Sequence, residues 1–195
     1  MNKDTVLEYF RDPPQLVTDR LVLRRMKKTD YHDMFDYAHN PEVTRYLTWE
    51  PHPDSLYTLR YLAYITTRYR AGDFSDWAVV LKENRRMIGT CGFTTFHYAH
   101  NSAEIGYVLH PDYWGRGIAA EAVRAVLSEG FLHLNLHRIE ARYMEGNARS
   151  RRVMEKVGMR FEGMQREAMF VKNTYVTIGV CAILAGEFIA GEGRV

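Results

Sequence analysis

The chain has 195 residues, of which 46% are hydrophobic, and this is enough for one folded domain with a full core. Its 26 lysines and arginines against 24 acidic residues give a net charge of +2, which argues against a protein that binds nucleic acid by neutralising many phosphates. Charges interrupt the short apolar stretch at the N-terminus and no apolar window reaches the length of a membrane span, so we expect a cytoplasmic protein with no membrane partner.

Periodicity in the first half of the chain predicts one strand, three helical segments and a hairpin. Asp30 is a candidate N-cap for the first helix, Asn40-Pro41 ends it, and Gly72 stops the third helix. Residues 1–15 form an N-terminal extension to which the sequence assigns no role. In chain order the predicted elements are a strand at 21–26, helices at 31–38, 43–47 and 55–70, and strands at 77–81 and 87–96.

The helical region is rich in aromatic residues, for which two interpretations stand. The side chains pack on an amphipathic face with their hydroxyls in water, or they form one wall of a substrate groove. The residues are Tyr46, Trp49, Tyr57, Tyr61, Tyr64 and Tyr69.

The second half predicts strands alternating with helices and a closing hairpin. The predicted elements are strands at 103–109, 138–143, 160–171 and 174–185, and helices at 117–134 and 148–157. The only clear β-α-β unit therefore surrounds the helix at 117–134. No linker interrupts the pattern, so we expect a single domain over residues 1–195.

The cysteines and histidines give no sign of a metal centre. Cys91 and Cys181 lie far apart without a nearby histidine at ligand spacing, so we expect two buried, reduced thiols. The eight histidines are scattered and form no HExxH pattern, and we expect no metal.

The most informative tract is a pair of glycines, Gly115 and Gly117, that opens directly into a run of helix formers. The free backbone N–H groups of a helix N-terminus bind phosphate. With Ala120 the pair also matches the dinucleotide pattern Gly-x-Gly-x-x-Ala. However, five residues separate it from the preceding strand, and the upstream strands are predicted to form hairpins. Both features argue against a dinucleotide fold.

Several tracts together resemble one enzyme family. They are residues 18–24, residues 88–93 and residues 103–122, followed by Asn147 and Ser150. This arrangement resembles the GNAT acetyltransferases, in particular the branch of ribosomal-protein N-terminal alanine and serine acetyltransferases. Trp114 stands where the wider superfamily has Gln or Arg, but the motif binds mainly through main-chain N–H groups. The resemblance covers nearly all of the chain after residue 16.

The resemblance implies an α/β (α+β) GNAT fold, with a mixed, mostly antiparallel sheet of about seven strands flanked by helices. It also implies acetyl-CoA as cosubstrate, with the pyrophosphate at the glycine pair and the pantetheine arm along the end of the strand at 103–109. Asn147 has a second role open to it as a helix N-cap. The implied cofactor-binding residues are Val108, Leu109, His110, Gly115, Arg116, Gly117, Ile118, Ala119, Ala120, Asn147 and Ser150. Two roles are open for three arginines at the start of the next predicted helix: each contacts the nucleotide phosphates, or it belongs to a solvated basic face. These are Arg149, Arg151 and Arg152.

Two residues are candidates for catalysis. Glu104 lies ten residues before Trp114, where histone acetyltransferases of the superfamily carry their general base, and its apolar strand should raise its pKa. Many members protonate the thiolate with a tyrosine seven residues after the motif asparagine, but that position is Met154 here. Ser150 therefore becomes the candidate acid, with coenzyme contact alone as its alternative role.

The expected activity is transfer of acetyl from acetyl-CoA to a primary amine, preferably the N-terminal α-amine of a ribosomal or other protein. At pH 7 roughly one α-amine in ten is neutral, against fewer than one lysine in a thousand. An α-amine can therefore be deprotonated by a weak general base. The alternatives are a small amine, such as a polyamine, amino acid or aminoglycoside, and a non-catalytic acyl-CoA sensor. A homodimer is compatible with the sequence.

Overall fold

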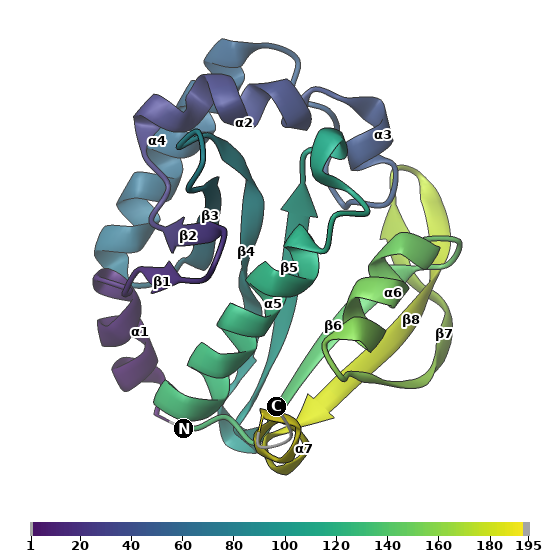
Figure 1. Cartoon of the computed structure of the whole chain (residues 1–195). Helices are drawn as coiled ribbons and strands as arrows, with labels where there is room; N and C mark the ends of the chain where they lie inside the picture. Colours follow the sequence, from purple (N-terminus) through teal and green to yellow (C-terminus); the bar gives the residue numbers. More distant parts are fainter. Residues whose placement is uncertain (1, 193–195) are drawn as a thin grey trace.

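The computed structural model describes residues 2–192. Its centre is one eight-stranded sheet in the order β1-β2-β3-β4-β5-β6-β8-β7 (Figure 1). Neighbouring strands are antiparallel except β5 and β6, which are parallel and are joined through helix α5. The strands are β1 (Leu16–Val17), β2 (Leu21–Arg24), β3 (Ser75–Leu81), β4 (Met87–His97), β5 (Ser102–Leu109), β6 (Arg138–Met144), β7 (Arg160–Val171) and β8 (Thr174–Leu184).

This sheet is mixed and mostly antiparallel, as expected, with one strand more than the expected seven. The additional strand is β1, a two-residue strand that pairs with β2 and that alternation could not identify at such a length. The other seven strands begin and end within two residues of their predicted positions. The largest differences are of two residues: β3 begins at Ser75, and β2 stops at Arg24, where the guanidinium pairs with Asp30 at 2.8 Å.

The helices also follow the predicted order, with two that the sequence did not predict, α1 near the N-terminus and α7 after the last strand. They are α1 (Lys3–Arg11), α2 (Tyr31–Ala38), α3 (Pro41–Thr44), α4 (Ser55–Ala71), α5 (Ile118–Ser128), α6 (Ala148–Lys156) and α7 (Ala185–Glu192). A π-helical turn, Glu129–His133, continues α5, so this helical segment ends one residue before the predicted end. Within residues 2–192, none of the helices has the length and apolar character that a membrane crossing requires.

The helix α1 occupies the segment that the sequence left as an extension. Its buried residues are Val6 and Phe10, and the Phe10 ring meets Trp77 edge to face at 5.5 Å between centroids. The indole N–H of Trp77 donates to the Pro14 carbonyl at 2.9 Å. The extension is therefore part of the core.

Two large hydrophobic cores lie on opposite faces of the sheet, and Met144, Val171 and Ile178 form a third, smaller cluster. Residues of α1, α5, α6 and α7 build one of them around Trp77 and Ile105. Residues of α2 and α4 build the other, which includes Ala78 and Val80 of β3. Side chains alternate between the faces of a strand, so neighbouring residues of β3 serve different cores.

The central feature for function is the divergence of β5 and β6. They pair only from Ser102 to Ile105, opposite Arg138 to Ala141. Beyond this point β5 stays paired with β4 and β6 with β8, and Figure 1 shows the two strands spreading apart. The backbone edge of β5 from Gly106 onward therefore has no strand beside it on that side. A cavity of about 1930 Å³ opens here and is lined by both strands, α2, α5 and α6.

Candidate active site

The glycine pair forms the expected turn into α5. Gly115 has φ +75° and Gly117 has φ +77°, left-handed conformations that favour glycine, and the helix begins at Ile118. The first N–H groups of α5 have no partners within the helix. A Cβ at Gly117 would lie 3.4 Å from Lys156 Nζ and 3.7 Å from the guanidinium of Arg20. Two cations therefore lie beside free N–H groups, and this arrangement suits a pyrophosphate.

An ion pair fixes the start of α5 against the N-terminal strands. Glu121 of the first turn pairs with Arg20 at 2.6 Å and accepts a hydrogen bond of 2.6 Å from the Thr18 hydroxyl. Arg20 also donates to the Arg116 carbonyl at 3.0 Å. Burial opposes these contacts, but together they lower the pKa of Glu121. The carboxylate is therefore ionised at neutral pH and positions the glycine turn at the start of α5.

The end of β5 offers Val108 and Leu109 to the cavity. The Leu109 carbonyl accepts the indole N–H of Trp114 at 2.8 Å, so Trp114 connects the strand end to the glycine turn. His110, the next residue, has its backbone and ring engaged in local hydrogen bonds. Its N–H donates to Ile88 at 2.7 Å, its carbonyl accepts from Tyr113 at 3.1 Å, and its ring accepts the N–H of Asp112.

The structure thus brings most of the expected cofactor residues together around one cavity. Neither His110 nor Arg116 is among its lining residues, and Arg116 instead lies 5.5 Å from the Tyr113 ring. The expected residues that line the cavity are Val108, Leu109, Gly115, Gly117, Ile118, Ala119, Ala120, Asn147 and Ser150.

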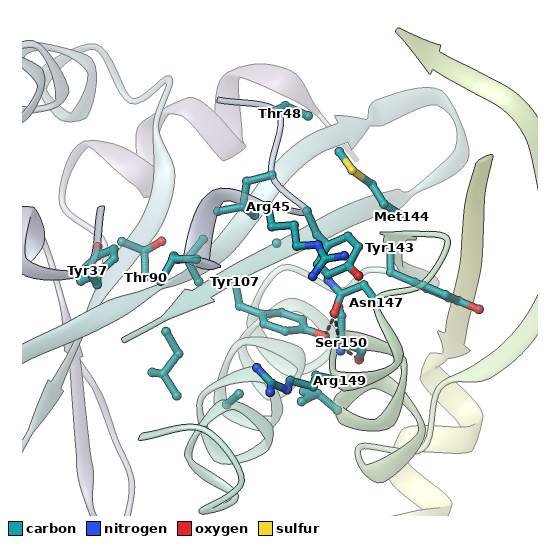
Figure 2. A pocket seen from close by; sticks show the side chains of 18 of the residues that line it. Tyr37, Arg45, Thr48, Thr90, Tyr107, Tyr143, Met144, Asn147, Arg149 and Ser150 are labelled. Atoms are coloured by element: carbon teal, nitrogen blue, oxygen red, sulfur yellow. Dashed lines mark hydrogen bonds between the residues drawn. The ribbon is translucent and has the colours of Figure 1, made fainter. Parts of the chain in front are cut away.

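The N-terminus of α6 forms the opposite wall. The Asn147 side chain accepts the N–H of Ser150 at 3.2 Å, so Asn147 is the N-cap of α6. The hydroxyl of Tyr107 lies 2.9 Å from Ser150 Oγ and donates to the Ser150 carbonyl at 2.9 Å (Figure 2). Met154, at the position of the superfamily tyrosine, is buried in the core.

Tyr107 is a residue that the sequence did not single out. Burial is the main cause that raises its pKa, so its hydroxyl stays protonated at neutral pH. It lines the cavity together with Ser150. Only the tertiary structure shows this pair, because 43 positions separate the two residues in sequence. Because the Tyr107 hydroxyl donates to the Ser150 carbonyl, the proton of the Ser150 hydroxyl is the one that the pair can donate into the cavity.

Glu104 lines the cavity on the sheet face opposite α5. Burial raises its pKa, while the guanidinium of Arg142, 3.3 Å away, lowers it. Glu140, its register partner on β6, raises it further. The desolvation that the apolar strand suggested is present, but an arginine on β6 partly offsets it.

Some residues of the aromatic region form a wall of the groove, and others pack in the core or face solvent. Four of its side chains, Tyr46, Trp49, Tyr57 and Tyr61, line the cavity. Tyr69 is instead buried in the core, where its hydroxyl donates to the Asp76 carbonyl at 2.5 Å. Tyr64 is exposed and contacts Arg68. The groove therefore has an aromatic wall that comes from α4 and the segment before it.

The arginines of α6 also separate. Arg149 lines the cavity, with its guanidinium 4.7 Å from the Trp114 ring and 3.2 Å from Glu42. Arg152 lines it too, whereas Arg151 pairs with Glu155 at 2.8 Å and does not. Cys91 and Cys181 are buried and free, as expected. Within residues 2–192, histidine, cysteine and acidic side chains form no group of three that could hold a metal.

The sequence matches the acetyltransferase (GNAT) domain family over residues 20–160. It is 32% identical over 173 residues to the uncharacterized N-acetyltransferase p20 of Bacillus licheniformis, covering 89% of this chain and 97% of p20. It is 33% identical over 171 residues to the uncharacterized N-acetyltransferase YoaA of Bacillus subtilis, covering 88% of this chain and 97% of YoaA.

Solved structures share the fold. A GNAT-family acetyltransferase from Bacillus anthracis superposes with a TM-score of 0.80 at 29% identity, over 89% of this chain and 100% of the other. The ribosomal-protein-S5-alanine acetyltransferase of Vibrio fischeri gives 0.71 at 21% identity, over 90% and 98% of the two chains. Spermidine N-acetyltransferase of Vibrio cholerae, in complex with CoA and spermine, gives 0.74 at 22%, over 88% and 99%.

Proposed function

This chain belongs to the GNAT family and is an acetyl-CoA dependent N-acetyltransferase, and from that premise we propose that its acceptor is the N-terminal α-amine of a protein. The charge pattern of the cavity carries this proposal. Glu42 pairs with Arg149 at 3.2 Å, Glu104 with Arg142 at 3.3 Å, and Glu50 with Lys172 at 3.7 Å. A polyamine carries several positive charges and needs several unpaired acids, whereas three of the four acidic residues that line the cavity are paired. A peptide N-terminus carries one ammonium on a neutral backbone.

The acid–base demand of the reaction also favours an α-amine. Its pKa of about 7.8 leaves roughly one molecule in ten neutral at pH 7, far more than for a lysine side chain. A carboxylate that is partly neutralised by an arginine, such as Glu104, suffices as a base for this acceptor. The aromatic wall of Tyr46, Trp49, Tyr57 and Tyr61 offers contact area to an extended peptide.

In the proposed site the chain holds acetyl-CoA with two helix ends and one strand edge. The N-terminus of α5, with Arg20 and Lys156 beside it, takes the pyrophosphate, and the free edge of β5 takes the pantetheine arm. The N–H near Val108 polarises the thioester carbonyl and stabilises the developing oxyanion. Ser150, with Tyr107 behind it, hydrogen-bonds the departing thiolate.

A mass-spectrometric search for acceptors tests the proposal. The enzyme and labelled acetyl-CoA are incubated with deacetylated cell extract, and labelled protein N-termini and small amines are identified in parallel. We expect label on a restricted set of N-termini that begin with alanine or serine. Label confined to polyamines, amino acids or aminoglycosides contradicts the proposed acceptor. No label on any amine, with acetyl-CoA still bound, favours an acyl-CoA sensor.

A further inference from the structure

A second carboxylate lies at the inner end of the cavity, on β3. Asp76 is a lining residue, and its Oδ1 atom is shielded from solvent with no hydrogen-bond partner within residues 2–192. The Thr90 hydroxyl and the backbone N–H of Trp77 hydrogen-bond to the carboxyl group. Among the ion pairs of the described chain none includes Asp76, unlike Glu104. A buried polar atom without a partner costs free energy unless a ligand or water satisfies it.

The groups around Asp76 are polar and carry no positive charge. Tyr37 of α2 also lines the cavity, and its buried hydroxyl likewise has no partner in the described chain. The charge of Asp76 also raises the pKa of three other groups, which are Tyr61 and Tyr69 of α4 and Cys91 of β4. All four have raised pKa values, with burial the main cause, and stay neutral at pH 7. An incoming cation is therefore the natural partner of Asp76.

The strand register directs Asp76 toward the reaction centre. Asp76 pairs with Gly92 of β4, which pairs with Gly106 of β5. A Cβ on Gly92 would lie 2.8 Å from Oδ1 of Asp76, so the carboxylate extends over this glycine toward β5. Thr90, the hydrogen-bond partner of Asp76, pairs with Val108, and both Thr90 and Tyr37 line the cavity (Figure 2).

We infer that Asp76, with Tyr37 beside it, binds the ammonium group of the acceptor and takes its first proton. The inference rests on the acceptor being an amine, as in the proposed function, and its site is separate from the Glu104–Arg142 pair. Burial raises the pKa of Asp76 to about 7, close to the α-ammonium value of about 7.8, so proton transfer between the two groups is nearly balanced.

The two carboxylates then have different tasks. The ammonium gives one proton to Asp76, and the neutral nitrogen attacks the thioester carbonyl, forming the C–N bond. Glu104 takes the second proton from nitrogen, which is far more acidic after attack, so an arginine-paired carboxylate is basic enough. The C–S bond breaks, and the thiolate leaves toward Ser150 and ends as the thiol with the second proton. The proton on Asp76 returns to solvent, so one proton is released per turnover.

Comparing Asp76→Asn with Glu104→Gln at two pH values tests this division. With a serine-initiated peptide as probe, we expect Asp76→Asn to lower kcat/KM roughly 100-fold at pH 7. The loss should shrink at pH 9.5, where an α-amine arrives neutral, whereas the loss in Glu104→Gln should not. Tyr37→Phe should raise KM with a smaller effect on kcat. Glu83→Gln, an exposed turn carboxylate, is the matched control.

Equal losses in Asp76→Asn at both pH values, or no loss, overturn the inference. A changed thermal shift with CoA in Asp76→Asn would assign the loss to misfolding, so the binding measurement decides in that case. This measurement follows the ¹³C signal of the Asp76 carboxyl, assigned through its correlations with the Asp76 backbone, in CoA-bound wild-type protein as propylammonium is added. We expect the signal to shift, and an unchanged signal overturns the inference.

The two proposals fail in distinguishable ways. If the peptide is not acetylated but propylammonium shifts the Asp76 signal, the proposed acceptor is wrong and the ammonium site stands. If the peptide is acetylated equally well by wild type and Asp76→Asn, the ammonium site is wrong and the proposed acceptor stands.

Discussion

Two carboxylates in one cavity, Glu104 and Asp76, have different surroundings. Glu104 meets a guanidinium at 3.3 Å, whereas Asp76 meets a threonine hydroxyl, a backbone N–H and neutral tyrosines. Burial raises the pKa of both groups, but only Glu104 has a cation that opposes the rise. The two carboxylates therefore differ in basicity because of the groups beside them, a guanidinium at Glu104 and neutral groups at Asp76, and not because of burial alone.

At the residue scale, the buried charge of Asp76 should cost stability at high pH. Its pKa is about 7 in the folded chain against an ordinary 3.8, so between these values the folded state binds more protons. Stability therefore falls as pH rises from 4 to 7. The stability of Asp76→Asn relative to wild type should therefore be greater at pH 8 than at pH 4, by about 4 kcal/mol.

Urea unfolding at the two pH values measures this difference. Glu83→Gln should show the same stability difference from wild type at both, because its carboxylate is exposed. A pH-independent effect of Asp76→Asn would mean that the Asp76 carboxyl titrates normally. The expected gain in stability, together with the expected loss of activity, would be a trade-off typical of an active-site charge.

At the element scale, the N-terminus of α5 combines glycine geometry with nearby cations. In Gly117→Glu a side chain is added at φ +77°, beside Lys156 and Arg20, and its carboxylate occupies the place of a phosphate. We expect the variant to lose the thermal stabilisation that CoA gives the wild type. Differential scanning fluorimetry with and without CoA measures it.

Gly186→Glu is the matched control, since Gly186 is exposed in the first turn of α7 with open space around it. It should keep the full CoA-induced shift. If Gly117→Glu were stabilised by CoA as much as the control, the phosphate would have to bind elsewhere.

At the scale of the whole molecule, some elements that stabilise the fold lie away from the candidate site. The helix α1 closes the core on the α5 face, and none of its residues lines the cavity. Phe10→Ala removes a fully buried ring that contacts Trp77 and Phe93. It should therefore lower the free energy of unfolding by about 3–5 kcal/mol.

The same variant should bind CoA with wild-type affinity at temperatures where it is folded. Denaturant unfolding and calorimetric titration measure the two quantities. Glu8→Ala, on the exposed side of α1, should change stability by less than about 0.5 kcal/mol. A Phe10→Ala protein with weakened CoA binding would show that α1 also supports the site.

The sequence by itself determined the elements whose signals are local. Alternation of apolar residues located seven strands. The left-handed turn at Gly117 favours glycine, and a glycine can be read directly from the sequence. The order of elements placed the β-α-β unit, and the motif around it resembled one family. The helix α1 was missed because its apolar face is short and interrupted by charges.

Only the tertiary structure decided which side chains meet. The pairs Glu104–Arg142 and Tyr107–Ser150 and the position of Asp76 over Gly92 depend on strand register and on the divergence of β5 and β6. Register is set by contacts between residues far apart in the chain, and a one-residue slip would turn each side chain to the other face. Local patterns therefore predicted the glycine turn and the helix that follows it, while the environment of each carboxylate depends on how the sheet is assembled.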